Sequence, residues 1–543
     1  MTSQSLTFDF AEWPPALTES QLEELTLAAT TYALSHGLLY LPPVAPNTNL
    51  PPIPTSAIHA PISLVPSPVP RHLFNDAKAL QSAYNTLYAR VAMDEEFLDK
   101  VMGAVEGVGR ADDFVGTLWK GWKAVRDEGI AQPLQLGLFR SDYLLHTGEG
   151  PGLSLKQVEF NTISSSFGPL SERTAAMHRH LHAFTNYYGA SPYFKAKNFP
   201  PNNTVAGLAE GLAEAHKAYG ISGSQILFVV QPNERNVFDQ RWLEYELLER
   251  HSIRVVRQTF AELAESAVID PTTRVLRIVS PSPSARGTSE GIEISTVYFR
   301  AGYVPTDLPT PTHYATRIAL ERSRAIKCPS IPLQLAGGKK VQEVLAKPGV
   351  LERFLGSESK DTLEDMRKTW MGMWALDDKD PSSTSSTIAA AADVGITANI
   401  VKEPLGTLKA RQQHASLVLK PQREGGGNNV YKEDIPAFLD RLPDAEREAW
   451  IAMELIVPPE QTGSYLVRAG GGAPPPGEST KSEARVKTEV ISELGIFGWA
   501  LFGDGDINGE KEVGWLVRTK GKESNEGGVA AGFSVLDSVL LVD

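Results

Sequence analysis

Residues 417–431, LVLKPQREGGGNNVY, say more about the fold than any other stretch of the sequence. A β-patterned run ends in Lys420, a charged loop with Glu424 follows, and three glycines at 425–427 stand before a second β-patterned run. Consecutive glycines expose backbone N–H groups and permit positive φ, so such a loop can fold over phosphate oxygens. No Gly-Lys-Ser/Thr follows, which excludes a Walker A loop. We predict a flexible flap over a nucleotide, with Glu424 as a carboxylate for Mg²⁺; a plain glycine-rich hairpin is the alternative.

A second segment, KQVEFNTISSSFG at 156–168, places oxygen ligands on a predicted strand. Glu159 and Asn161 are two residues apart, so both side chains project from one face. A carboxylate and an amide oxygen are hard ligands that suit Mg²⁺. The serines at 164–166 supply hydroxyls at a turn, which can grip a peptide-like substrate. Taken alone, the segment also fits a half-buried strand with a polar turn.

A third segment, residues 514–537, combines cations with a small flexible loop. Arg518 and Lys520 alternate onto one face of a predicted strand, and a loop of small residues follows at 526–532. Arg140 and Arg300 add cations at the ends of other predicted strands. Phosphorylating a carboxylate before an amine attacks it requires Mg²⁺ between phosphates, cations around the acyl phosphate and a lid that excludes water. Together the three segments indicate ATP, Mg²⁺ and carboxylate chemistry.

The rest of the chain has an α/β pattern. A capping box at Thr18 and Gln21 predicts a helix over residues 19–36. The proline-rich stretch 41–70 predicts extended surface chain. Helical patterns run from about 72 to 126, after which strand and helix patterns alternate. Two stretches rich in Gly, Pro, Ser and charged residues, 377–389 and 469–484, are predicted as mobile loops.

Composition excludes several classes of protein. At roughly 150 residues per domain, 543 residues suggest two to four domains. Acidic residues outnumber basic ones by 65 to 52, which argues against nucleic acid or an anionic membrane as partner. Cys328 is the one cysteine, so no internal disulfide or cysteine-ligated zinc site can form. The N-terminal residues lack the basic and apolar segments of a secretory signal, and no apolar run reaches about 18 residues, so we expect a cytoplasmic protein.

Three local motifs do not carry a function. Residues 287–291 spell GxSxG, but no strand pattern precedes them, so a hairpin turn is favoured over a hydrolase nucleophile. Asp504 opens an EF-hand-like sequence, but Trp515 stands where the bidentate Glu belongs, so we predict a turn between antiparallel strands. His178 and His180 are two residues apart on a predicted helix and point in different directions, which favours core or solvent-exposed histidines over a metal pair.

At this point the sequence closely resembles the eukaryotic-type glutathione synthetase family of ATP-grasp ligases. The matching blocks run in family order from about residue 130 to the C-terminus, and the first 130 residues agree more loosely. The blocks are LGLFRSDY, QVEFNTISSSFG, ERNVFDQR, VYFRAGY, IKCPSIPLQLAGGKKVQ, LVLKPQREGGGNNVY, ISELGIFG and LVRTKGKESNEGGVAAGFSVLD.

The resemblance implies that ATP drives the joining of γ-glutamylcysteine to glycine through an acyl phosphate, giving glutathione, ADP and phosphate. It implies Mg²⁺, two ions per site, held by Glu159, Asn161 and Glu424. The implied ATP-binding residues are Glu159, Lys339, Lys420, Glu424, Gly425, Gly426, Gly427, Asn428, Asn429, Tyr431, Met453, Glu454, Leu455, Ile456, Glu493, Lys520 and Glu526. The implied substrate-binding residues are Arg140, Ser164, Ser166, Glu234, Asn236, Gln240, Arg300, Tyr303, Arg518, Val529 and Ala530. Arg140 and Arg518 are the implied catalytic residues, with Arg140 stabilising the acyl phosphate and Val529 and Ala530 bordering the glycine end.

The resemblance also implies an architecture. An α/β substrate-binding domain, 222–334, is inserted into a discontinuous ATP-grasp core of 1–221 and 335–543, and a lid at 365–490 carries the glycine loop. A homodimer is expected. Ala301 and Glu526 depart from the family pattern, which commonly has Asp at both positions. Two alternatives stay open: a related ligase that uses β-alanine or serine as acceptor, and an inactive nucleotide-binding scaffold.

Overall fold

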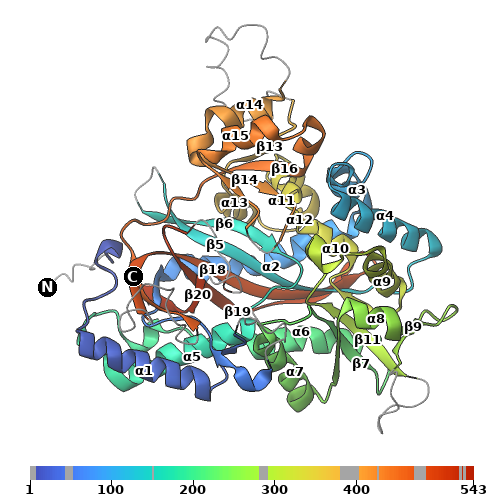
Figure 1. Cartoon of the computed structure of the whole chain (residues 1–543). Helices are drawn as coiled ribbons and strands as arrows, with labels where there is room; N and C mark the ends of the chain where they lie inside the picture. The colour runs from blue at the N-terminus through green and yellow to red at the C-terminus, as the bar shows by residue number, and fades with distance from the viewer. Residues whose placement is uncertain are drawn as a thin grey trace, which may run out of the picture.

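Two long antiparallel strands form the centre of the molecule, as the computed structural model of the chain shows (Figure 1). Strand β18 (Arg485–Gly503) pairs along its length with β19 (Asp506–Gly521). Asp504 and Gly505 connect them, both with positive φ, at 52° and 82°. Two left-handed residues give the twist that a tight hairpin needs, so the predicted turn at this place is confirmed. The structure describes residues 8–42, 53–148, 152–279, 291–379, 403–424, 427–469, 485–524, 529 and 534–543.

Within the described ranges, eleven further strands join this hairpin in one large sheet of thirteen strands. On one side of β18 lie β5 (Gln135–Thr147) and then β6 (Leu153–Asn161), both antiparallel to their neighbours. The start of β5 also pairs in parallel with β12, which continues the sheet into a parallel part. That part contains β7 (Gln225–Val229), β8 (Val255–Gln258), β11 (Ile292–Phe299) and β12 (Ile326–Cys328), and β9 (Ala267–Ile269) and β10 (Leu276–Ile278) form its antiparallel edge.

Helices cover both faces of the large sheet. On one face α2 (Arg71–Met93) packs against β18, β19 and β5. On the other face α5 (Gly168–Thr185) and α6 (Thr204–Tyr219) pack against the same hairpin, and α1 (Glu19–Ser35) lies outside α5. The remaining helices of this body are α3 (Glu95–Met102), α4 (Asp113–Glu128), α7 (Val237–His251), α8 (Phe260–Ser266), α9 (Pro311–Arg322), α10 (Ile331–Ala336), α11 (Lys339–Leu345), α12 (Val350–Leu355) and α13 (Lys360–Lys368). In the described part of the chain, no helix is both long and apolar enough to cross a bilayer.

A second, small sheet stands above the large one (Figure 1). Its strands occur in the order β13 (Met373–Ala375), β16 (Trp450–Glu454), β14 (Leu417–Pro421) and β15 (Val430–Tyr431), all antiparallel. Helices α14 (Leu405–Gln412) and α15 (Asp434–Arg441) accompany it. Its apolar side chains form a cluster separate from those of the body. The glycine loop of 425–427 therefore connects two strands of this small sheet, as predicted.

The local expectations have mixed outcomes. Helix α1 carries the complete Thr18–Gln21 capping box, so the predicted helix is confirmed. His178 is buried in α5 and His180 is exposed on it, so the rejection of a metal pair is confirmed. Residue Gly291 is described, but the rest of the GxSxG motif and most of the two predicted loops lie outside the described residues.

The prediction of a surface location for residues 41–70 is wrong for its second half. Strands β2 (Ile58–His59), β3 (Ile62–Ser63) and β4 (Ser67–Pro70) form there, and residues 59–69 are buried. Strand β1 (Leu39–Tyr40) pairs with β2, β3 pairs with β17 (Gly463–Val467) and β20 (Ser534–Asp537), and β4 pairs with β21 (Val539–Val542). The extended backbone that the prolines favour offers free N–H and C=O groups, and these are paired with strands from the far end of the chain.

Candidate active site

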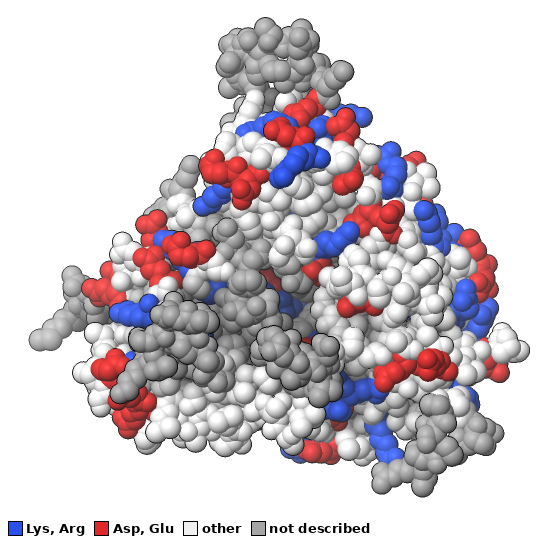
Figure 2. Space-filling view, in the orientation of Figure 1, with Lys and Arg blue, Asp and Glu red and all other residues white. Residues whose placement is uncertain are grey.

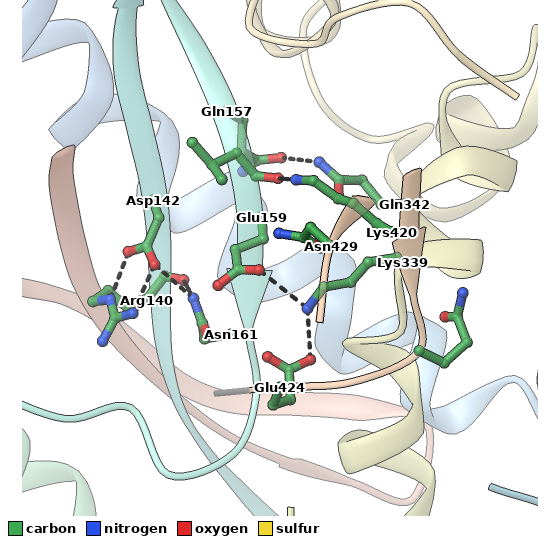
Figure 3. Close-up of polar contacts among 12 residues, drawn as sticks. Arg140, Asp142, Gln157, Glu159, Asn161, Lys339, Gln342, Lys420, Glu424 and Asn429 are labelled. Carbon is green, nitrogen blue, oxygen red and sulfur yellow. Dashed lines mark hydrogen bonds and ion pairs between the residues drawn. The ribbon is translucent and has the colours of Figure 1, made fainter. Parts of the chain in front are cut away.

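A buried cluster of arginines and carboxylates lies on the large sheet. Arg140 donates to both oxygens of Asp142, two residues along β5, with Nε–Oδ1 at 2.5 Å and Nη2–Oδ2 at 2.6 Å. Arg518 of β19 donates to the same Asp142 Oδ2 at 3.1 Å and also contacts Glu493 of β18. Asn161, at the end of β6, donates its amide to Asp142 Oδ2 at 2.9 Å (Figure 3). One fully buried carboxylate thus fixes three side chains that the sequence assigns to the site.

Strand register explains this convergence. Arg140 lies directly opposite Asn161 in the β5–β6 pair, and Glu493 lies opposite Arg518 in the β18–β19 pair. Directly opposed residues of antiparallel strands have neighbouring side chains on one face. These two pairs of residues lie more than 300 positions apart in the sequence, and the antiparallel pairing of β5 with β18 brings them together.

A second cluster forms around the amino group of Lys339, the first residue of α11. Its Nζ lies 3.1 Å from Oε2 of Glu159 on β6 and 2.8 Å from Oε1 of Glu424, which follows β14 (Figure 3). Lys420 on β14 approaches the same strand β6 and donates to the carbonyl of Val158 at 2.9 Å. Both acids and both lysines were predicted for the site, and they meet between the large and small sheets.

Burial and charge separate the pKa values in this second cluster. Burial alone would raise the pKa of the Glu159 carboxyl, but Lys339, Lys420 and Arg518 outweigh it and hold that pKa below its usual value. Burial raises the pKa of Glu424 above its usual value, and the charge of Glu159 adds to that effect. Burial also lowers the pKa of Lys420 to about 8, helped by the charge of Lys339. The site therefore holds one ionised acid, one acid whose charge is disfavoured, and lysines that a polyanion would stabilise in the charged form.

The oxygen donors in this region fit a hard divalent cation. Glu159 and Glu424 already converge on a cationic group, the Lys339 amine. The two amide hydrogens of Asn161 are donated to Asp142 Oδ2 at 2.9 Å and to the Arg140 carbonyl at 3.3 Å, which leaves the amide oxygen as an acceptor. Among the described residues, no three His, Cys, Asp or Glu side chains form a metal site by themselves. Mg²⁺ usually takes one or two carboxylates and completes its shell with phosphates and water, so the donors suit a metal that arrives with a nucleotide.

The serine turn between β6 and α5 connects two predicted substrate-binding arginines. The Ser166 carbonyl accepts from Arg140 Nη1 at 3.2 Å, and the Ser166 hydroxyl accepts from Arg300 Nη2 at 2.5 Å. Ser164 adopts a positive φ of 52° and donates its hydroxyl to the Phe299 carbonyl at 3.0 Å. The turn therefore sets Arg140 and Arg300 side by side, as anion-binding chemistry requires.

Polar side chains from the start of α7 lie near the same turn. Glu234 accepts from the Asn236 backbone N–H at 2.8 Å and from the Gln240 side chain at 3.1 Å. Oδ1 of Asn236 and Nε of Arg300 are buried and have no hydrogen-bond partner within the described residues. Buried polar atoms are normally satisfied, so atoms left open beside a cluster of this kind are candidates for ligand contact.

Two aspartates that hold this region together were not among the predicted site residues. Asp142 is the first, and its position two residues after Arg140 on a strand, hence on the same face, is a signal that could have found it. Asp239 is the second. It lies in α7, is buried, and accepts from the backbone N–H groups of Phe167 at 2.8 Å and Leu170 at 3.1 Å, where α5 begins. Asp239 lies within the ERNVFDQR block, but nothing in that block indicates a contact with residues about 70 positions earlier in the chain.

The small sheet carries further residues predicted to bind the nucleotide. Met453 and Glu454 lie on β16, and Met453 pairs with Val418 of β14 and is buried. Asn429 donates to the Tyr431 hydroxyl at 3.2 Å beside β15. The other described residues of the predicted sets are Gly427, Asn428, Leu455, Ile456, Tyr303, which follows β11, Lys520, which lies on β19, and Val529, which is buried. Predicted residues outside the described part are Gly425, Gly426, Glu526 and Ala530.

The surface shows where these groups open to solvent. In the space-filling view a recess lies below the small sheet, and acidic and basic side chains are visible at its bottom (Figure 2). Charges of both signs are interspersed over the rest of this face (Figure 2). Two acids and two lysines meet between the large sheet and the small sheet, and the arginines lie beside them. This arrangement is that of an α/β ligase of the ATP-grasp type.

Comparisons with known proteins identify the family. Residues 19–541 match the sequence profile described as eukaryotic glutathione synthase, ATP binding domain. The chain is 39% identical over 521 residues to glutathione synthetase of Bos taurus and 38% identical over 521 residues to that of Homo sapiens, covering 96% of this chain and 97% of each relative. The chloroplastic glutathione synthetase of Solanum lycopersicum is 37% identical over 489 residues, covering 89% of this chain and 78% of that protein. The chain therefore belongs to the eukaryotic glutathione synthase family.

A solved structure shares the fold. A glutathione synthetase like-effector from Globodera pallida, in its apoform, superimposes with a TM-score of 0.69 over 97% of this chain and 98% of that one, at 23% identity. At that identity the likeness concerns the fold alone, and it supports the ATP-grasp architecture expected from the sequence.

Proposed function

We propose that this chain is a glutathione synthetase, which ligates γ-glutamylcysteine to glycine while ATP is converted to ADP and phosphate. The observation that carries the proposal is the convergence of Lys339, Glu159 and Glu424 next to the Arg140–Asp142–Arg518 cluster, in a chain that belongs to this family throughout its length. An inactive scaffold would have no need to retain all of these charges in contact.

The reaction has two steps. An oxygen of the substrate carboxylate attacks the γ-phosphorus of ATP, ADP leaves, and an acyl phosphate forms. The glycine nitrogen then attacks the acyl carbon, phosphate leaves with the electrons of the C–O bond, and the amine loses a proton. No side chain needs to form a covalent intermediate, because the substrate itself is the nucleophile.

The residues of this chain bind and orient the reacting groups. Lys339 and Lys420 offer positive charge to the phosphates, and burial strengthens that attraction. Arg140 and Arg518, held by Asp142, offer fixed donors where negative charge develops on the acyl phosphate. The serine turn and Arg300 hold the peptide part.

We propose that Glu159, Asn161 and Glu424 hold Mg²⁺, with two ions per site. The metal supplies charge neutralisation of the phosphates when bound. The two carboxylates and the free amide oxygen support this assignment. Isothermal titration of the ATP analogue AMP-PNP with and without Mg²⁺ tests it: Glu159→Gln should remove the metal dependence of binding.

We further propose the domain division that the sequence suggests, with residues 222–334 as substrate-binding domain, 365–490 as lid, and the remainder as core. The parallel strands and α7 to α9 lie in the first segment, and the small sheet lies in the second. Limited proteolysis with and without ATP tests the lid assignment, because a closing lid should gain protection. A cytoplasmic location also stays a prediction.

We also propose a homodimer. On α1, Leu27 is 70% exposed and Leu34 is 52% exposed, one above the other on a single face, and on α7 Leu248 is 52% exposed. The two helices lie along the same side of the molecule (Figure 1), and Trp242 of α7 donates to the carbonyl of Gly37, just after α1, at 3.1 Å. Sedimentation should show a dimer for the wild type and a monomer for Leu27→Glu with Leu248→Glu. Val105→Glu, an exposed apolar position elsewhere, is the matched control and should stay dimeric.

Measuring ADP release tests the reaction. With γ-glutamylcysteine, release should depend on glycine, and glutathione should accumulate in equal amount. β-Alanine is one methylene longer, so kcat/KM should favour glycine by roughly 10- to 200-fold. Equal use of both acceptors would favour the related-ligase alternative, and no release with either would favour the inactive scaffold.

A further inference from the structure

The turn that carries Tyr303 is held by a single carboxylate. Oδ2 of Asp307 accepts from the backbone N–H groups of Gly302 at 2.8 Å and Tyr303 at 3.2 Å. The preceding residue, Ala301, is buried and offers no polar side chain, although the family pattern suggested an acid there. Asp307 thus supplies the negative charge at this turn from six positions further along the chain.

The second oxygen of Asp307 reaches a side chain. Oδ1 accepts from Nε2 of Gln231 at 2.7 Å, and the same Nε2 donates to the Tyr303 hydroxyl at 3.0 Å. Gln231 follows the carboxyl end of β7, and Tyr303 follows the carboxyl end of β11, the parallel neighbour of β7. In open α/β sheets, ligands bind beyond the carboxyl ends of parallel strands.

These contacts fix the direction of every hydrogen bond. An ionised carboxylate only accepts, so Gln231 must turn its NH₂ group, not its carbonyl, toward Asp307. The same NH₂ group faces Tyr303, so the hydroxyl oxygen is an acceptor in that bond and its hydrogen is left to point elsewhere. Burial, Asp307 and Glu234 raise the pKa of Tyr303 to about 12, so the hydroxyl keeps its hydrogen at neutral pH.

The surroundings of Tyr303 belong to the substrate region. Glu234 and Arg300, both predicted to bind the peptide substrate, act on the hydroxyl electrostatically. Arg300 also donates to the Ser166 hydroxyl. A donor at this place therefore faces groups that hold the γ-glutamyl end.

We propose that Asp307 and Gln231 form a relay that fixes the Tyr303 hydroxyl as a hydrogen-bond donor to a carboxylate of the γ-glutamyl substrate. This inference rests on the proposed function and adds to it two positioning residues that determine how the substrate is recognised. A relay of the opposite polarity would present an oxygen lone pair to the same carboxylate and repel it.

The test is a variant that reverses polarity without removing contacts. In Asp307→Asn, the amide oxygen stays with the two backbone N–H groups, so the new NH₂ group faces Gln231. Gln231 must then present its carbonyl, which accepts the Tyr303 hydrogen and withdraws it from the substrate. Adding Gln231→Glu locks this arrangement, since a carboxylate cannot donate.

The doubly substituted Gln231→Glu, Asp307→Asn protein should keep the wild-type Tm, kcat and KM for ATP. Its KM for γ-glutamylcysteine should rise roughly 10- to 100-fold, the range for a lost hydrogen bond to a charged group. Tyr303→Phe should show the same rise, and combining it with the double substitution should add nothing, because both remove the same bond. Asp270→Asn is the control: Asp270 also caps a turn, accepting from Thr272 at 2.9 Å and Thr273 at 2.6 Å, and its substitution should leave every KM unchanged.

The outcomes separate the relay from the proposed function. A wild type that releases no ADP with γ-glutamylcysteine overturns both. An active wild type whose double variant folds and keeps its KM overturns the relay alone. If the double variant does not fold, the single Asp307→Asn variant decides: an unchanged KM overturns the relay, and a rise equal to that of Tyr303→Phe supports it.

Discussion

The arginine cluster and the lysine cluster differ in what holds their charges in place. Asp142 is fully buried and fixes Arg140 and Arg518. All three residues lie on strands of one sheet. Lys339 is held by Glu159 from the large sheet and by Glu424 from the end of a strand of the small sheet. The first cluster is built into one rigid element, whereas the second spans two.

The difference suggests that the two clusters do different work. The Asp142 carboxylate is fully buried, and its oxygens accept from Arg140, Arg518 and Asn161, so these contacts orient the two arginines without a bound substrate. The carboxylates that hold Lys339 are the ones proposed to take Mg²⁺, so binding of metal and nucleotide must replace the contacts seen here. We therefore expect changes in the lysine cluster to affect turnover without affecting stability, and changes in the arginine cluster to affect both.

The largest effect should come from Glu424→Gln. Loss of the carboxylate removes a metal ligand, and a loss of about 4 kcal/mol of transition-state stabilisation corresponds to roughly 10³-fold in kcat. The Tm should not fall, because burial already disfavours the charge of Glu424, as its raised pKa shows. Steady-state ADP release and thermal unfolding measure the two quantities.

Glu433→Gln is the matched control for this experiment. Glu433 also belongs to the region of the small sheet, but its side chain is 80% exposed and contacts His414 at 3.2 Å. It should keep wild-type kcat. If Glu424→Gln turned over as fast as this control, Glu424 would not be a metal ligand.

The second prediction concerns Arg140→Ala. Its guanidinium is proposed to meet charge that develops mainly in the transition state, so kcat should fall about 10²- to 10³-fold while KM changes less. Asp142 keeps Arg518 and Asn161 as partners, so the protein should still fold. A rise in KM alone would make Arg140 a binding residue and not a catalytic one.

The two clusters also show what the sequence could and could not reveal. Glu159 and Asn161 were placed on one strand face from their spacing, and the family blocks marked Lys339 and Lys420. Asp142 was not predicted because its contact with Arg518 depends on the pairing of β5 with β18, which lie more than 300 residues apart. Spacing along one strand identifies a face, but it does not identify what lies opposite.

The same limit explains the wrong surface assignment in the proline-rich segment. Its extended conformation followed from local chemistry, and β2, β3 and β4 bear it out. Its burial depends on β17, β20 and β21, which lie more than 400 residues later in the chain. Helix α1, in contrast, is fixed by its own capping box and was predicted to within one residue.

The third prediction tests the stability half of the comparison. Asp142→Asn keeps the shape of the side chain but leaves two buried arginines with less compensating charge. Breaking a buried ion pair costs about 3–5 kcal/mol of stability. Loss of a residue that orients catalytic groups typically costs about 10- to 100-fold in activity. Urea unfolding should therefore separate Asp142→Asn from Glu424→Gln, and equal stability of the two variants would remove the distinction between the clusters.

The smallest effect concerns the pH dependence of ATP binding. The pKa of Lys420 is lowered to about 8, chiefly by burial. ATP phosphates bind the protonated amine, so kcat/KM for ATP, which reports the free enzyme, should be constant below pH 8 and fall up to about tenfold per pH unit above it. Lys420→Arg should abolish this decline, because arginine stays protonated throughout.

Lys327 provides the control, since burial also lowers its pKa to about 8, but it lies on β12 and donates to the Ser323 carbonyl. Lys327→Met should keep the wild-type pH profile. If the decline disappeared in Lys327→Met and persisted in Lys420→Arg, the titrating group would be Lys327, and Lys420 would not bind the phosphates.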